Sequence, residues 1–227
     1  MQPSCNQNDS SFLCLLQLQQ LADSAFPIGS AAHSFGIETL VDAGFLNTES
    51  LAAFLDAYLH ETGTLEAAYC GASCGAGPAE WLTLNAELGA RKLARESRDA
   101  SSAMGRRFLR LTASISGNEL LIAASDLQAE THLAACFGLV SGVFGIDAVT
   151  AAAAYLQQSM TALVSACQRL LPLGQTQAHQ ILWNLKPAIL AAVDRSVTEP
   201  ALASSFTPLL DIASARHATL YTRLFMS

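Results

Sequence analysis

Apolar residues recur at helical spacing along the whole chain, and this periodicity limits the possible fold more than any other feature. No segment alternates polar and apolar β-branched residues as a half-buried strand would. The clearest helical segment follows Asp147, where apolar residues alternate steps of four and three: Val149, Ala153, Leu156, Met160, Leu163, Cys167 and Leu170. Such an a/d seam predicts a long helix that crosses a neighbouring helix at a shallow angle. We therefore expect an all-α fold.

Capping residues, glycines and prolines predict where the helices begin and end. A first helix should start at Ser10 or Ser11 and end before Phe26-Pro27, and further helices are expected over 37–43, 51–69, from 78, over 91–110, from 148 to Pro172, over 175–193 and over 208–221. Neither an internal repeat nor a long linker divides the chain. The expected architecture is a single-domain array of about eight to ten helices. We expect a flexible N-terminus over 1–10, a helical domain over 11–216 and a C-terminal partner-binding tail over 217–227.

Charge is strongly segregated along the sequence. Residues 1–90 contain no Lys or Arg, whereas seven cations lie between Arg91 and Arg110, and the net charge is −7. A chain with this balance can hardly assemble the basic face that nucleic acid requires, so a DNA-binding regulator that uses residues 91–110 is disfavoured. The two regions either steer a charged protein partner or face each other across the fold. Because only 14% of residues are charged, much of the surface must be apolar or neutral, which favours contact with partner subunits.

The sequence predicts neither secretion nor a membrane span. Its six cysteines are scattered through apolar stretches without a disulfide-framework pattern, and the N-terminus lacks the cationic region of a signal peptide. The longest apolar stretch, 133–156, is interrupted by Asp147 and by glycines, so it does not resemble a transmembrane helix. We expect a cytoplasmic protein that does not act at a membrane.

The chain contains a match to a catalytic motif, but not the structural context that this motif requires. Residues 71–75 match G-x-S-x-G, and Asp194 or Asp211 with His217 would complete a triad. That motif needs a strand immediately before the serine, whereas helical spacing precedes this one. Lys92 and Lys186 are the only lysines and neither follows a glycine, so no P-loop is present. We therefore predict that the chain is not an enzyme.

Two cysteine-containing pairs have the spacing of metal ligands on one helix face, namely Cys70 with Cys74 and His132 with Cys136. Glu130 stands near enough to His132 to orient the imidazole. Two ligands do not make a strong site, so core packing is the preferred interpretation and a helical metal-binding carrier or enzyme is the alternative. Gly138 and Gly142 form a close-packing motif that also suggests a self-association interface.

Two segments contain polar residues whose presence is not explained by packing in the hydrophobic core. Residues 23–38 crowd His33, Ser34, Gly36 and Glu38 into a turn before a short helix, and polar loop residues on a helical scaffold are candidates for recognition. The C-terminal segment is rich in the Arg and aromatic residues typical of interface hot spots. These are Arg216, His217, Tyr221, Arg223 and Phe225.

The order of several short motifs resembles the UreF family of urease accessory proteins from about Phe12 onward. They are D-S-A-F-P-I-G-S at 23–30, H-S-F-G-I-E at 33–38, A-G-F at 43–45, R-E-S at 95–97, residues 132–138, R-L-L-P-L-G-Q at 169–175 and H-A-T-L-Y-T-R-L-F-M-S at 217–227. Phe35 and Ile37 stand where the family often has other residues.

The resemblance implies a non-enzymatic, all-helical chaperone that forms a homodimer and helps to insert nickel into the urease apoenzyme. Its implied partners are the accessory protein UreD (UreH) and the nickel-carrying GTPase UreG. Matching positions imply that His33, Ser34, Gly36 and Glu38 face the GTPase, and that UreD binds a second set: His217, Tyr221, Arg223, Leu224 and Phe225. The dimer seam is implied between residues 133 and 171. No tightly bound cofactor is expected, because nickel passes through the complex.

Overall fold

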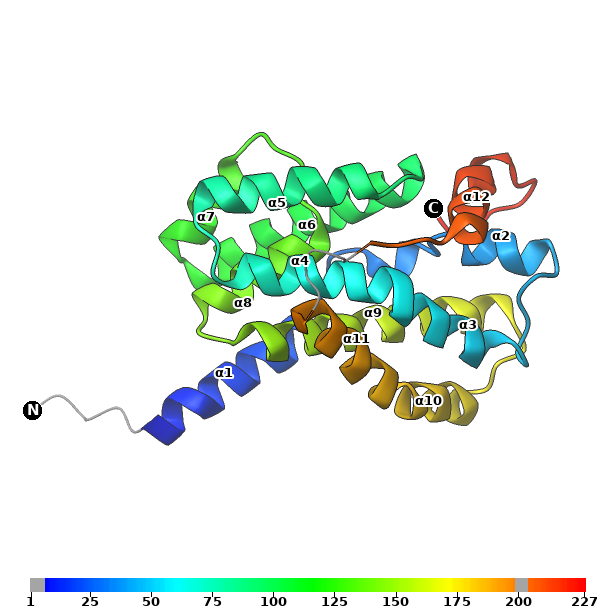
Figure 1. The fold of residues 1–227 in the computed structure, drawn as a ribbon, viewed down its shortest axis with the longest axis horizontal. Helices are drawn as coiled ribbons and strands as arrows, with labels where there is room; N and C mark the ends of the chain where they lie inside the picture. The colour runs from blue at the N-terminus through cyan, green and yellow to red at the C-terminus, as the bar shows by residue number, and fades with distance from the viewer. Residues whose placement is uncertain (1–6, 199–203) are drawn as a thin grey trace, which may run out of the picture.

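The computed structural model describes residues 7–198 and 204–227, and within these ranges it consists of helices and loops without a strand (Figure 1). This confirms the predicted all-α, single-domain fold. The helices are α1 (Gln7–Leu21), α2 (Ile37–Asp42), α3 (Leu51–Tyr58), α4 (Thr64–Cys74), α5 (Pro78–Arg91), α6 (Arg95–Ser116), α7 (Glu119–Asp126), α8 (Leu133–Val143), α9 (Ala148–Leu170), α10 (Gln175–Asn184), α11 (Lys186–Thr198) and α12 (Pro208–Arg216).

Several predicted boundaries differ from those of the structure. The helix expected over 51–69 is α3 and α4 joined by a π-helical turn at Leu59–Gly63, and the one expected over 175–193 is divided into α10 and α11. The last helix ends at Arg216 and continues as a 3₁₀ turn, His217–Thr219, instead of reaching Tyr221. Residues 7–10 of the expected flexible N-terminus already belong to α1, and residues 1–6 lie outside the described part.

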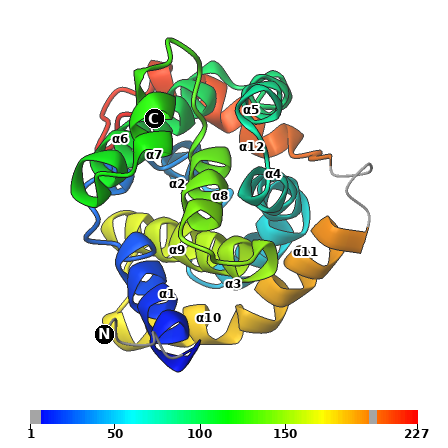
Figure 2. The ribbon, with the colours of Figure 1, turned by 90° about the vertical axis from the view of Figure 1, so that its left-hand side faces the viewer.

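Helix α8 lies at the centre of the bundle, surrounded by α4, α6 and α9 (Figure 2). Its approach to α4 depends on two glycines. A Cβ atom built on Gly138 would lie 2.0 Å from the Cys70 carbonyl oxygen, and one on Gly142 would lie 1.8 Å from that of Cys74. This confirms the close-packing interpretation of the glycine pair. It corrects the suggested self-association interface, because α4 of the same chain covers the glycine face.

Helix α9 buries most of its predicted seam. Leu156, Met160, Leu163 and Cys167 are buried, whereas Val149 in the first turn is 50% exposed. The seam packs against α4, α8, α10 and α11 rather than against a single long helix. It therefore belongs to the core of this chain, and the implied dimer seam over 133–171 lies on helices that are largely buried inside it.

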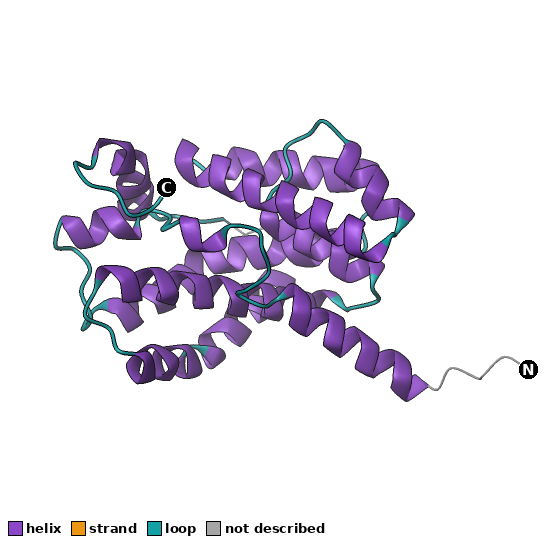
Figure 3. Cartoon of the chain, turned by 180° about the vertical axis from the view of Figure 1, so that it is seen from behind, coloured by secondary structure: helices purple, strands orange, loops and turns teal. Residues whose placement is uncertain are grey.

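Helix α1 projects from the body of the molecule (Figure 3). Four of its apolar residues are exposed, namely Phe12, Leu13, Leu15 and Leu16. Among residues 7–198 and 204–227, no helix combines the length and the apolar character needed to cross a bilayer.

Candidate functional site: a C-terminal segment clasped by the 31–38 loop

The two segments that sequence reasoning set apart lie against each other. Residues 217–227 run along the loop that precedes α2 and along the start of α2 itself, and backbone and side-chain hydrogen bonds join them. We call this arrangement the C-terminal clasp, formed by residues 31–38 with 217–227. The sequence predicted two separate surfaces, and the structure instead has one connected unit.

Glu38 is the centre of the clasp. Its carboxylate accepts hydrogen bonds from the backbone N–H of Leu224 (2.6 Å) and of Phe225 (3.3 Å), and its Oε2 lies 2.7 Å from Nε2 of His217. Only 5% of Glu38 is exposed, so the carboxylate faces the inside of the molecule and not a partner. The expectation that His33, Ser34, Gly36 and Glu38 are presented on the surface is therefore wrong, because all four are buried. A buried carboxylate requires polar partners, and the C-terminal segment supplies them.

His217 lies between two carboxylates and is completely buried. Its Nε2 faces Glu38, and its Nδ1 lies 3.1 Å from Oε2 of Glu96, near the start of α6. The imidazole thereby connects α2, α6 and the C-terminal segment. The sequence contains no signal for this role of Glu96 beyond its position in the R-E-S motif at 95–97.

The end of the segment is held by the loop before α2. The backbone N–H and the hydroxyl of Ser34 both donate to the main-chain oxygen of Ser227, at 2.6 and 2.9 Å, and His33 Nδ1 lies 2.8 Å from the Ser227 hydroxyl. Met226 N–H donates to the Ala32 carbonyl. Burial, and then the nearby positive charge of Arg107, lower the pKa of His33, so the neutral imidazole is favoured in this contact.

The backbone conformation of residues 35 and 36 lets the loop before α2 lie close to α12. Gly36 has a φ of +88°, and a Cβ there would lie 2.9 Å from the Ser214 nitrogen in α12. Phe35 adopts a φ of +53°, which is uncommon for a residue with a side chain. A side chain at position 36 would prevent the close approach of α2 to α12, so glycine is needed there. The strained backbone at Phe35 is maintained by the residues that surround it.

Arg169, at the end of α9, closes the clasp from the other side. Its guanidinium donates to the carbonyl oxygens of Ala31 (2.8 Å) and Leu224 (3.4 Å) and lies 4.3 Å from the ring centroid of Phe225. Such a cation–π contact is worth about 0.5–2 kcal/mol. The sequence contained no signal for this role beyond the position of Arg169 in the R-L-L-P-L-G-Q motif.

At the end of the molecule formed by α12 and the C-terminal segment, the exposed residues are mostly apolar. Tyr221 and Arg223 project outward, whereas Phe225 is buried under Arg169. The exposed apolar residues of α12 and its flanks form what we call the α12 face: Phe206, Leu209, Ile212, Tyr221, Leu224 and Met226. Such a concentration of exposed apolar side chains within residues 206–226 makes this end of the molecule a candidate protein contact.

The two cysteine-containing pairs pack in the core or against it, as their preferred interpretation predicts. His132 and Cys136 are fully buried, and burial raises the pKa of the Cys136 thiol far above its ordinary value. Burial raises the pKa of Cys74 to about 11, and Cys70 is shifted in the same direction. Metals bind thiolates, so these environments disfavour binding. No group of three or more His, Cys, Asp or Glu residues that could hold a metal ion occurs in the described ranges.

His132 makes stability depend on pH. Burial, followed by the charge of Lys92, lowers its pKa from 6.5 to about 4. Between these values the unfolded chain binds a proton that the folded protein excludes, so the free energy of unfolding should fall as the pH drops from 6.5 to 4, by about 3 kcal/mol. Urea titrations at several pH values would measure this loss. A His132→Gln variant should show a smaller loss, and identical pH dependence in both proteins would contradict the assignment.

The fold and the site define an all-helical protein with a clasped C-terminal segment beside an exposed apolar face. The family model described as UreF matches residues 46–186. The chain is 35% identical to the urease accessory protein UreF of Trichormus variabilis, over 93% of this chain and 95% of the relative. It is 34% identical to UreF of Corynebacterium glutamicum, with 96% and 99% covered, and 32% identical to urease accessory protein F of Oryza sativa subsp. indica, with 91% and 82% covered.

The chain belongs to the UreF family of urease accessory proteins. The relatives are named as accessory proteins and not as enzymes, which confirms the prediction that this chain is not an enzyme.

Proposed function

We propose that this protein supports nickel insertion into urease by holding UreD (UreH) and the GTPase UreG together, so that nickel reaches the urease apoenzyme. Its membership of the UreF family supports a role in urease maturation. The observation that carries the bridging role is the clasp, which fixes the C-terminal segment beside the loop matched to the GTPase side. Both recognition segments thereby lie at one end of the molecule (Figure 1).

The α12 face is proposed as the UreD side. Leu209 and Ile212 on α12, with Tyr221 and Leu224 on the clasped segment, present exposed apolar side chains, and Arg223 adds an exposed cation beside them. An apolar centre with an aromatic and an Arg residue has the composition of a binding hot spot. Buried His217 and Phe225 support this face from below.

The GTPase side is proposed to act through the loop and not through direct contact of every predicted residue. Glu38 and Ser34 are buried and hydrogen-bonded to the C-terminal segment, so they would position a surface for the GTPase.

We further propose that the working protein is a cytoplasmic homodimer, which light scattering of the purified chain would test. Nickel would be handled transiently by the complex without a tight site on this chain.

The UreD side can be tested by removing two exposed side chains. The double variant Tyr221→Ala/Leu224→Ala should bind UreD at least tenfold more weakly, because truncation of a hot-spot side chain costs about 2 kcal/mol or more. Calorimetric titration of UreD into each protein would measure the change. Phe45→Ala is the matched control, since Phe45 is similarly exposed but lies at the turn after α2. Unchanged affinity in the double variant would remove this face from the interface.

A further inference from the structure

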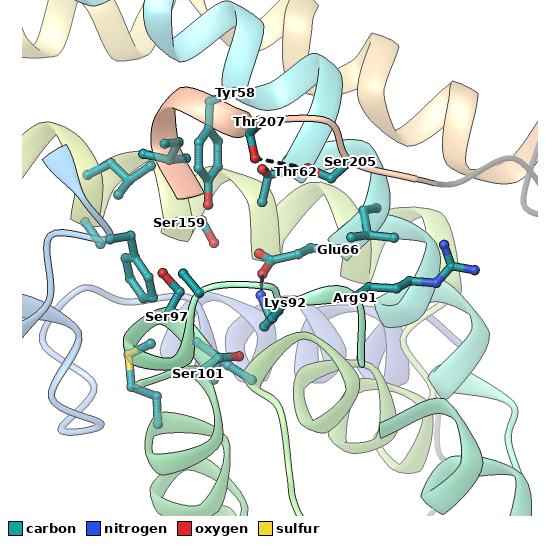
Figure 4. A pocket seen from close by; sticks show the side chains of 18 of the residues that line it. Tyr58, Thr62, Glu66, Arg91, Lys92, Ser97, Ser101, Ser159, Ser205 and Thr207 are labelled. Carbon is teal, nitrogen blue, oxygen red and sulfur yellow. Dashed lines mark hydrogen bonds and ion pairs between the residues drawn. The ribbon is translucent and has the colours of Figure 1, made fainter. Parts of the chain in front are cut away.

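A cavity lies between the helical body and the segment that leads into α12 (Figure 4). Its walls come from α3, α4, α6 and α9, from the end of α5, from the loop before α2, and from residues 205–211. It offers about 90 Å³ to the centres of water-sized molecules. At about 10–15 Å³ per water, that space accommodates a molecule of roughly six to nine non-hydrogen atoms.

Two of the four charged residues that line the cavity neutralise each other. Glu66 on α4 pairs with the Lys92 ammonium, and its other oxygen accepts a hydrogen bond from the Tyr155 hydroxyl at 2.6 Å. Figure 4 shows Glu66 and Lys92 pointing toward each other in the middle of the cavity. Both oxygens of Glu66 are therefore already occupied, and this pair by itself attracts neither a cation nor an anion.

The third charged residue, Arg91, is engaged at the edge of the cavity. Its Nε donates to the Tyr69 hydroxyl at 2.9 Å, and that hydroxyl donates to the Glu87 carboxylate at 3.3 Å. Figure 4 shows the Arg91 side chain directed away from Glu66 and Lys92. Because Arg91 is exposed, water and the nearby Glu87 carboxylate screen its charge.

The fourth charged residue, Asp211 in the first turn of α12, forms no ion pair with a described residue. Its Oδ2 accepts a hydrogen bond from the Thr207 hydroxyl at 3.4 Å. The residue is only partly buried and is in contact with the cavity. Burial raises the pKa of Asp211, and this effect exceeds the lowering by Thr207 and by the charge of Lys92. The ionised carboxylate is therefore incompletely stabilised.

Inside the cavity, two carboxylates thus share one ammonium, that of Lys92. A second ammonium beside Asp211 would balance the charges. Phe35 and Tyr58 also line the cavity, and aromatic rings both attract cations and accommodate an apolar body.

We propose that this cavity binds a small primary ammonium ion with a short apolar body, held by an ion pair with Asp211. The inference does not depend on the proposed function. Its consequence reaches the clasp, because Asp211 belongs to α12 whereas the other walls belong largely to the body. The segment before α12 is attached through contacts such as Thr62 to Ser205 at 3.2 Å and Phe206 N–H to Glu61 at 3.0 Å. A bound ammonium ion would stabilise this segment and α12.

Benzylammonium and benzyl alcohol form a matched pair of probes, since they have the same number of non-hydrogen atoms and differ in charge. A cavity without an available carboxylate would favour the alcohol, because an ammonium ion is costlier to remove from water. With Asp211 as its partner, the full-length protein should bind benzylammonium saturably and about tenfold or more tightly than benzyl alcohol. Ligand-observed NMR titration at neutral pH would measure both affinities. Hydrogen exchange should slow within residues 204–211 when benzylammonium is bound.

The variant Asp211→Asn keeps the shape of the side chain and removes its charge, so it should lose the preference for benzylammonium. Asp194→Asn is the matched control, because Asp194 is exposed on α11 and lies outside the cavity lining. It should keep the preference, which would show that the net charge of −7 is not what attracts the probe.

Four results would each overturn the proposal. They are no saturable binding of benzylammonium, equal affinity of the wild-type protein for the alcohol, a preference that survives Asp211→Asn, and a preference that is lost in Asp194→Asn. Binding without slower exchange in residues 204–211 would place the probe elsewhere and would also reject it. The wild-type comparison and its exchange data decide the matter even if Asp211→Asn does not fold.

Discussion

Replacing Glu38 by Ala should free residues 217–227 from the body while the helical core stays folded. Hydrogen bonds to a charged group contribute roughly 1.5–3 kcal/mol each, and Glu38 accepts two from the backbone of the C-terminal segment and faces His217. We expect the free energy of opening of this segment to fall by about 3 kcal/mol or more. Hydrogen exchange of the Leu224 and Phe225 amides would measure this free energy. Recruitment of the GTPase and activation of urease should decline as these amides exchange faster.

The control for this experiment is Asp42→Ala, because Asp42 lies on the same short helix but is exposed. It should leave exchange of the C-terminal amides unchanged. If Glu38→Ala exchanged at the wild-type rate, the clasp would not depend on this carboxylate. If exchange rose while urease activation stayed unchanged, the clasp would exist without serving the proposed function.

Substituting Gly138 by Val should destabilise the whole protein by about 3 kcal/mol or more, because overpacking a core typically costs 1–3 kcal/mol and here the obstacle is backbone. Even the first added carbon would meet the Cys70 carbonyl oxygen at 2.0 Å, so α4 and α8 would have to separate. Urea denaturation followed by circular dichroism would measure the change.

Gly75→Ala provides the comparison at the end of α4. A Cβ at Gly75 would meet nothing within 4 Å, and its φ of −109° suits any residue. This variant should therefore unfold at nearly the wild-type urea concentration. A Gly138→Val protein as stable as Gly75→Ala would show that the two helices tolerate separation.

The fold was largely predictable because helical spacing and caps are local properties. Asp147 caps α9, where its carboxylate accepts a hydrogen bond from the Thr150 N–H as its position predicted, and Pro78 begins α5. The π turn within 51–69 was not predicted. Gly63 and the gap in apolar spacing between Leu59 and Leu65 interrupt the pattern there, but they do not distinguish a π-helical turn from a continuous helix. The burial of the glycine face was also missed, since Gly138 and Gly142 suit a contact within a chain as well as one between chains.

The clasp could be predicted only in its parts. Motifs identified both segments, but nothing local shows that Glu38 accepts hydrogen bonds from residues 186 and 187 positions away. The roles of Glu96 and Arg169 could not be predicted for the same reason. Both are charged residues near helix ends, where such side chains usually face solvent. Their roles depend on tertiary contacts with His217 and Phe225.

The sequence separation across the clasp also has a consequence for how the protein folds. The helices around α8 are formed by residues that precede α12, whereas the Glu38 carboxylate accepts its hydrogen bonds from groups of residues 217–227, and the Ser34 hydroxyl donates its own to them. Contacts between such distant residues are the slowest to form, because the loop-closure entropy must be overcome first. During synthesis, a compact helical intermediate should therefore appear while Glu38 still lacks its backbone partners. Closure of the clasp would be the last step of folding, and chains released early would keep a folded core with an open end.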